Sequence, residues 1–145
     1  MKEENNIKVL DEVNKGCTMG MDSLKDILNK AEGKTFKETL ERHYKKYEKL
    51  SEKIKELYDE YSEENPQETT AMEKTMTWYG IQMRTMNDNS NSKISELLMQ
   101  GTNMGIIEGR RLINENAHAA DDVKGILHDF VVMQEDSVET LKKYL

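Results

Sequence analysis

The sequence predicts an all-α protein, and three observations lead to that fold class. The composition favours helix, since the 145 residues include one proline and eight glycines, and 34% of them are charged. Apolar residues recur at spacings of three and four through most of the chain, as in a helix that buries one face. No segment alternates with the period of two that is typical of a strand. The length suits a single domain over residues 1–145 with one hydrophobic core.

The apolar spacing predicts two long helices in the first half of the chain. The first is expected from Asn6 to Ala31, and Gly33 is expected to stop it. Its apolar stripe consists of Leu10, Val13, Cys17, Gly20, Leu24, Ile27 and Ala31. The second is expected to open with a capping box formed by Thr35 and Glu38. Its apolar stripe is unusually regular and consists of Phe36, Leu40, His43, Tyr47, Leu50, Ile54, Leu57 and Tyr61.

Three further helices are expected in the rest of the chain. The single proline is tolerated only in a first turn, so a third helix is predicted over residues 66–86. Ser92 is expected to cap a fourth helix that runs from Lys93 to Glu115. Asp121 and Asp122 favour the positive end of a fifth helix that continues to the C-terminus.

The first and fourth predicted helices share a sequence pattern. At an ungapped offset of 85 residues, "NIKVLDEVNKGCTMGM" (6–21) aligns with "NSKISELLMQGTNMGI" (91–106), and in the same register His43 aligns with His128. This repeat predicts two copies of a helical hairpin, over residues 6–63 and 92–145, joined by a connecting helix over 66–87. The identical pairs are Asn6 with Asn91, Lys8 with Lys93, Gly16 with Gly101, Met19 with Met104, and Gly20 with Gly105.

This arrangement, with Trp78 in the segment "MTWYGIQMRTM" between the hairpins, resembles an uncharacterised bacterial family of the ferritin-like superfamily. The resemblance implies a ferritin-like four-helix bundle, in a superfamily whose active members hold two iron or manganese ions between the helices. Such a site takes an inward Glu from each of two helices and a Glu-x-x-His pair from each of the others. Neither His43 nor His128 has a glutamate three residues earlier, and Met19 and Met104 stand where the resemblance places carboxylates. The pattern of dinuclear ligands is therefore missing.

Five glycines lie inside the first and fourth predicted helices and leave two interpretations open. Each costs roughly 0.8 to 1 kcal/mol relative to alanine in a helix interior, so another interaction must offset them. A Gly-x-x-x-Gly row allows close approach of a second helix or a bulky side chain. Alternatively, the rows make room for a small ligand or ion between the first and fourth helices. With Met19 and Met104, the proposed packing or interface residues here are Gly16, Gly20, Gly101, Gly105 and Gly109.

Four titratable residues are the candidates for a metal site. His43 lies on the core stripe, where it is a buried hydrogen-bonded residue, a metal ligand or an acid-base catalyst. Glu108 lies on the glycine face, and it either pairs with Arg111 or turns inward. If His43, Glu108, His128 and Glu135 converge, they form a mononuclear iron or manganese site. This metal-binding bundle is the alternative function.

Methionine and aromatic residues suggest packing and association. The ten methionines are interpreted as core and interface residues, with soft-metal or haem ligation as the alternative. Cys17 lies on the apolar stripe and is expected to be a small buried residue. Trp78, Tyr79 and Met83 on the connecting helix predict a dimer interface or a cap over one end of the core.

Charge and motifs exclude several functions. The net charge of -7 disfavours nucleic-acid binding. No apolar run approaches the roughly 18 residues of a membrane span, and the first residues lack the core of a signal peptide, which predicts a cytoplasmic protein with no membrane contact. No catalytic triad, phosphate loop, zinc pattern or dinucleotide fingerprint is present. The sequence therefore predicts a non-enzymatic ferritin-like bundle without a cofactor that acts by self-association, as a dimer, or by binding a partner or small ligand.

Overall fold

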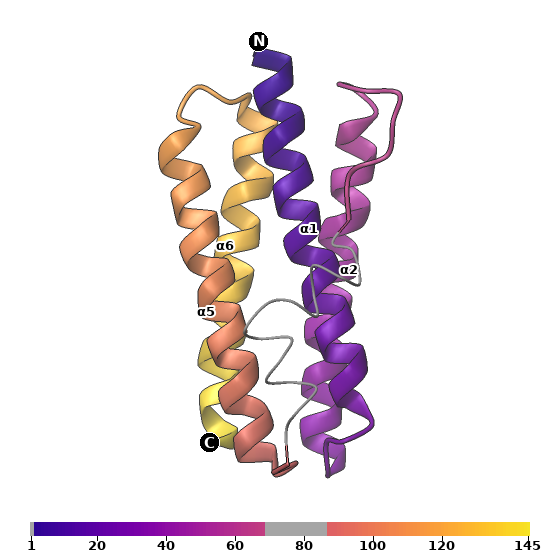
Figure 1. Ribbon diagram of the computed structural model, residues 1–145, viewed down its shortest axis with the longest axis vertical. Helices are drawn as coiled ribbons and strands as arrows, with labels where there is room; N and C mark the ends of the chain where they lie inside the picture. Colours follow the sequence, from indigo (N-terminus) through magenta and orange to yellow (C-terminus); the bar gives the residue numbers. More distant parts are fainter. Residues whose placement is uncertain (1, 69–86) are drawn as a thin grey trace.

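The computed structural model describes residues 2–68 and 87–145, which form a four-helix all-α bundle (Figure 1). Its helices are α1 (Lys2–Leu28), α2 (Lys34–Tyr58), α5 (Asn91–Glu115) and α6 (Asp121–Leu141), and a short 3-10 turn, η1 (Lys142–Tyr144), ends the chain. Most of the predicted connecting helix, over residues 69–86, lies outside the described residues. None of the helices in the two described segments is long and apolar enough to cross a membrane.

The four helices pack as two hairpins, as the sequence predicts. Helix α1 packs along α2, and α5 packs along α6. In Figure 1 the two pairs stand side by side with their long axes nearly parallel. The hairpins meet mainly through α1 with α6 and α2 with α6, whereas the contact between α1 and α5 is less extensive. The α1–α5 side is therefore the more open seam of the bundle.

The buried faces follow the predicted apolar stripes. In the first helix and the turn after it, the expected stripe is buried except at Gly20, which is half-buried. Its buried members are Leu10, Val13, Cys17, Leu24, Ile27 and Ala31. In α2, the stripe is buried from Phe36 to Ile54, while Leu57 and Tyr61 are only half-buried. Tyr58, which the predicted stripe omits, is buried instead. Periodicity therefore predicts the core of hairpin one, with an error in the last turn of α2.

The predicted start of the second helix is wrong. Thr35 and Glu38 form no capping box, because α2 already begins at Lys34 and no side chain caps this end. Gly33 precedes it with a φ of 87°, in the left-handed region that glycine adopts without strain. The reversal of the chain at Gly33 brings Lys34 into helical geometry before the Thr35 hydroxyl can act as a cap. Helix α1 ends at Leu28, three residues before the expected Ala31.

Of the two predicted helix starts in hairpin two, the cap of α5 is wrong and the first turn of α6 is correct. Ser90, not the predicted Ser92, caps α5, and its Oγ accepts a hydrogen bond of 3.2 Å from the backbone N–H of Lys93. The cap therefore lies two residues earlier than predicted. In contrast, Asp121 and Asp122 do lie in the first turn of α6, where their charge favours the positive helix end.

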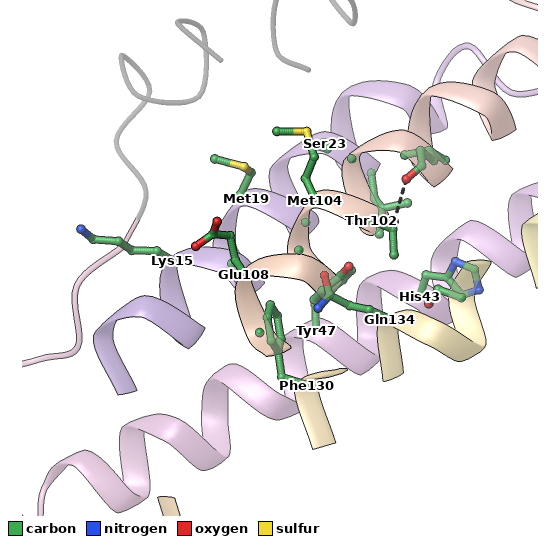
Figure 2. Close-up of a pocket in the computed structure, with 18 of the residues that line it drawn as sticks. Lys15, Met19, Ser23, His43, Tyr47, Thr102, Met104, Glu108, Phe130 and Gln134 are labelled. Carbon is green, nitrogen blue, oxygen red and sulfur yellow. Dashed lines mark hydrogen bonds between the residues drawn. The ribbon is translucent and has the colours of Figure 1, made fainter. Parts of the chain in front are cut away.

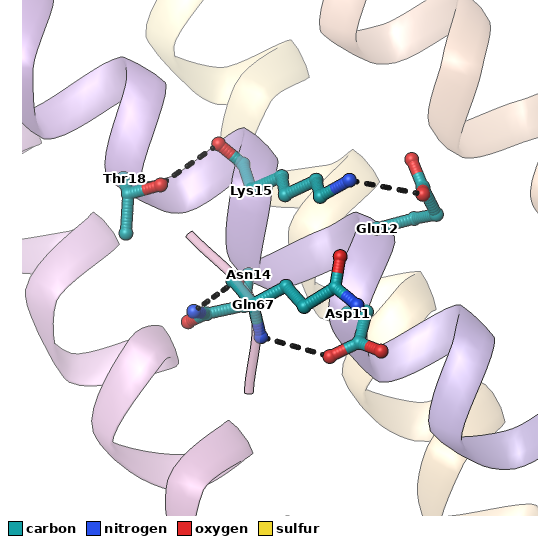
Figure 3. Close-up of polar contacts among 6 residues, drawn as sticks. All are labelled: Asp11, Glu12, Asn14, Lys15, Thr18 and Gln67. Carbon is teal, nitrogen blue, oxygen red and sulfur yellow. Dashed lines mark hydrogen bonds and ion pairs between the residues drawn. The ribbon is translucent and has the colours of Figure 1, made fainter. Parts of the chain in front are cut away.

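A partly buried polar network attaches the segment after α2 to α1 (Figure 3). The backbone N–H of Gln67 donates to Asp11 Oδ1 at 2.8 Å, and its carbonyl accepts from Asn14 Nδ2 at 2.9 Å. Asn14 Oδ1 also accepts a hydrogen bond of 2.7 Å from Ser51 Oγ. Since both backbone groups of Gln67 bind α1, residues 66–68 do not start a helix, and the prediction that a helix begins at Pro66 is wrong there.

The two hairpins repeat one burial pattern, but with different offsets in their two helices. At the predicted offset of 85 residues, four of the five buried residues of α5 align with buried residues of α1, and these pairs are Val9 with Ile94, Leu10 with Ser95, Val13 with Leu98, and Leu24 with Gly109. Buried residues of α2 and α6 correspond at 87 residues, so that Phe130, not His128, stands at the position of His43. The predicted equivalence of the two histidines is wrong, and His128 is exposed. The pairs at 87 residues are Phe36 with Val123, Thr39 with Ile126, Leu40 with Leu127, His43 with Phe130, Tyr47 with Gln134, Leu50 with Ser137, and Ile54 with Leu141.

Asn6 and Asn91, an aligned pair, each hold the loop of the opposite hairpin. Asn91 Oδ1 accepts from the N–H of Glu32 at 3.1 Å, and its Nδ2 donates to the Glu32 carbonyl at 2.7 Å. Asn6 Oδ1 accepts a 3.0 Å hydrogen bond from the N–H of Ala120. The first helix of each hairpin therefore anchors the loop of the other, as expected for a pseudo-twofold arrangement.

We expect Asn91→Ala to lower the free energy of unfolding by about 1 kcal/mol, because it removes two hydrogen bonds at the protein surface. Urea unfolding followed by circular dichroism measures the change. Asn103→Ala, at an exposed position of the same helix, is the control and should change stability by no more than about 0.5 kcal/mol. Equal effects of the two substitutions would mean that the loop anchor contributes nothing.

Candidate functional site

A cavity of about 360 Å³ lies between α1 and α5, and side chains of α2 and α6 form its floor (Figure 2). Both glycine rows line it, so the structure brings the predicted packing residues of the two aligned helices to one place. The lining residues from this set are Gly16, Met19, Gly20, Gly101, Met104, Gly105 and Gly109.

The glycines let floor side chains approach the backbones of α1 and α5. A Cβ added at Gly20 would lie 2.7 Å from the Tyr47 ring, closer than real Cβ contacts. A Cβ added at Gly105 would overlap Oε1 of Gln134. Because Tyr47 and Gln134 are equivalent positions of the two hairpins, the same arrangement of a glycine over a large floor side chain occurs twice.

His43 contributes an uncharged polar group to the cavity floor. Only 5% of the residue is exposed. Burial lowers the pKa of the imidazole to about 4, and the positive charges of Lys46 and Arg42 lower it further. The imidazole is therefore neutral at neutral pH.

Two buried polar atoms of the lining have no hydrogen-bond partner within the described structure. They are Nε2 of Gln134 in the floor and Oγ of Ser23 in the α1 wall. Each residue is 3% exposed, and leaving such a group unsatisfied costs about 1 to 3 kcal/mol. Neither residue belongs to a recognisable motif, so sequence reasoning missed both. In the sequence, the only sign that they are buried is that each lies four residues from an apolar core residue, Ile27 or Phe130.

The charged residues of the lining are paired at its solvent-exposed edge. Lys15 Nζ lies 3.8 Å from Glu12 Oε1, and Glu108 binds the guanidinium of Arg111. The predicted pairing of Glu108 with Arg111 is therefore confirmed. Ion pairs this exposed contribute little to stability. Among the described lining residues, the floor from α2 and α6 contains no Asp, Glu, Lys or Arg side chain.

The four candidate metal ligands do not converge. His43 is buried in the floor, whereas His128 is exposed on α6 because the register of that helix turns it away from the core. Glu108 pairs with Arg111, and Glu135 accepts a hydrogen bond of 3.2 Å from Arg110. Among residues 2–68 and 87–145, no group of three His, Cys, Asp or Glu side chains is placed to hold a metal ion. The prediction of a shared site for these four residues is wrong.

The remaining residues that the sequence singles out lie in the core, beside the cavity, or outside the described residues. Cys17 is fully buried in the core, as predicted, and burial raises the pKa of its thiol. Trp78, Tyr79 and Met83 lie outside the described residues, so the dimer interface or end cap expected of them stays a prediction. Met104 is 46% exposed beside the cavity, while Met19 is half-buried.

Comparison with known proteins provides no assignment, because no protein-family model, curated protein or solved structure matches the chain. The class defined by the fold and the site is a four-helix bundle of two hairpins with a glycine-lined cavity in one seam.

Proposed function

We propose that this protein is a non-enzymatic helical bundle that binds a small, mostly apolar molecule in the cavity between α1 and α5. The observation that carries the proposal is the cavity itself, which two glycine rows line. Its volume of about 360 Å³ is within the range of roughly 300 to 1,000 Å³ that is usual for ligand pockets. Large apolar side chains contribute from all four helices, and they include Leu24, Tyr47, Leu98, Leu112, Phe130 and Leu141.

The lining favours binding over catalysis. His43 is the only histidine among the described lining residues, and the pKa of its imidazole is about 4. Such an imidazole is a weak base and so a poor general base at neutral pH. The nearby carboxylates, Glu12 and Glu108, are paired with cations at the edge. The remaining polar groups are hydroxyls and the Gln134 amide, which serve better to orient a ligand than to transform it.

The bundle is further proposed to be ferritin-like and to have arisen by duplication of one hairpin. Support comes from the repeated burial pattern and from the loop anchors that Asn6 and Asn91 provide in exchange. The two equivalent contacts, Gly20 with Tyr47 and Gly105 with Gln134, add to it.

A neutral fluorescent probe tests the proposed binding. N-phenyl-1-naphthylamine should bind the parent protein with a saturable rise in fluorescence. Gly20→Leu adds bulk to the α1 wall and Thr102→Leu adds it to the α5 wall, so each should weaken binding by about tenfold or more. Gly125→Leu is the matched control, because Gly125 is exposed on α6 with no atom within 4 Å of an added Cβ.

The variants distinguish a specific cavity from general adhesion. Far-UV circular dichroism and urea unfolding show whether each one is folded. Undiminished binding by both folded wall variants would place the probe elsewhere and reject the cavity as the site. Absence of saturable binding by the parent protein would reject the proposed function.

A further inference from the structure

We infer that the cavity selects uncharged, mostly apolar molecules that carry a hydrogen-bond acceptor such as a carbonyl oxygen, and that the Gln134 amide N–H binds this acceptor. This inference rests on the proposed function. It adds the chemical class of the ligand and the residue that recognises it.

The position of Gln134 carries the first step. Its side chain extends from α6 to the glycine face of α5, where the absence of a Cβ at Gly105 leaves space for the amide oxygen. The residue is 3% exposed, lines the cavity, and has an Nε2 without a partner in the described structure (Figure 2). An amide N–H in this position can only donate, so the group that satisfies it must be an acceptor.

Ser23 supplies a second unsatisfied group, from a different wall. Its Oγ is buried on α1, one turn beyond Gly20, and also lacks a partner in the described part of the chain. A hydroxyl both donates and accepts, so Ser23 does not narrow the ligand class further. It does provide a second polar contact at a separate point of an otherwise apolar surface.

The charges of the cavity lining favour a neutral ligand. Among the described lining residues, the side chains with a full charge at neutral pH are Glu12, Lys15 and Glu108, and each is in an ion pair at the exposed edge. The deeper polar groups, on His43 and Gln134, are uncharged. A buried charge without a partner is strongly unfavourable, so a carboxylate or ammonium in the floor would be rejected. The preferred ligand is therefore neutral.

A pair of isosteric competitors tests the hydrogen bond. Benzophenone and 1,1-diphenylethylene have the same shape, but only the ketone has an acceptor oxygen. Each is titrated against bound N-phenyl-1-naphthylamine, in the parent protein and in Gln134→Leu. The ratio of the dissociation constant of benzophenone to that of 1,1-diphenylethylene should be about tenfold higher in the variant, because the variant loses the hydrogen bond to the ketone. Comparing ratios cancels the difference in hydration between the two competitors.

Control variants and a charged competitor complete the experiment. Gln100→Leu, at an exposed position of α5 outside the cavity, should leave the ratio as in the parent. Gln134→Met, which keeps an unbranched chain, replaces Gln134→Leu if the leucine variant is unfolded. Diphenylacetate, which is similar in size but anionic, should not displace the probe at concentrations at which benzophenone does.

The outcomes separate this inference from the proposed function. If both neutral competitors bind and the ratio is the same in the Gln134 variants, the amide is satisfied by water and the inference is overturned while the binding function stands. Displacement by diphenylacetate as readily as by benzophenone would overturn the selection for neutral ligands. If neither neutral competitor displaces a probe that the cavity binds, the inference also fails.

Discussion

Acidification should destabilise this protein by up to about 3 kcal/mol through His43 alone. The imidazole has a pKa of 6.5 when it is exposed in the unfolded chain and about 4 in the folded protein, where it is buried. Below pH 6.5 the unfolded state therefore takes up a proton that the folded state still excludes. Stability is lost progressively as the pH falls from 6.5 to 4, and this contribution levels off at lower pH.

The measurement is the free energy of urea unfolding at several pH values across that interval. His43→Phe isolates the effect, because it removes the imidazole and introduces the residue that stands at the equivalent position of α6, Phe130. The difference between the parent and variant curves removes the contribution of carboxylates, which is common to both. His128→Gln is the control at an exposed position, and its curve should follow the parent. Parallel curves for the parent and His43→Phe would contradict the burial of a neutral imidazole.

Two glycine substitutions are expected to change stability in opposite directions. Gly109→Ala should lower the free energy of unfolding by about 1 to 2 kcal/mol, whereas Gly125→Ala should raise it by about 1 kcal/mol. Both substitutions gain helix propensity. A Cβ at Gly109, however, lies 2.6 Å from Cγ2 of Val131, a fully buried and stiff β-branched side chain. At Gly125 an added Cβ meets no atom within 4 Å.

Thermal and urea unfolding of the two variants measure this difference of about 2 to 3 kcal/mol. Each glycine serves as the control for the other, since the chemical change is the same. Stabilisation by both alanines would show that α5 and α6 can separate without cost, and that Gly109 is not needed for their close packing.

The sequence predicts the helices and their buried faces better than it predicts the alignment between them. Periodicity is a property of each helix alone, so most of the α1 stripe and most of the α2 stripe are correct. The offset of α6 depends on where α5 ends and how its loop turns. The glycine repeat in α1 and α5 carries no information about those positions. The repeat therefore aligned His43 with His128, while packing places Phe130 there.

The candidate site could be predicted only in part, for a related reason. The glycines are visible in the sequence because they are costly within helices, and they do line one cavity. Gln134 and Ser23 resemble ordinary helix residues, and their importance arises only because no partner reaches them after folding. The pairing of Glu108 with Arg111 was predictable because both residues lie on one helix, one turn apart.

The exchanged anchors of Asn6 and Asn91 have a consequence for how such a bundle could originate. Each asparagine binds the loop of the other hairpin, so one hairpin contains both the donor surface and the acceptor surface of the contact. Two separate copies of a single hairpin could then form the same bonds reciprocally, in an isologous homodimer. Fusion of the two genes would convert that intermolecular interface into the interior of one chain. With such an origin, later divergence of the two halves would account for the different residues, Tyr47 and Gln134, at equivalent positions of the two hairpins.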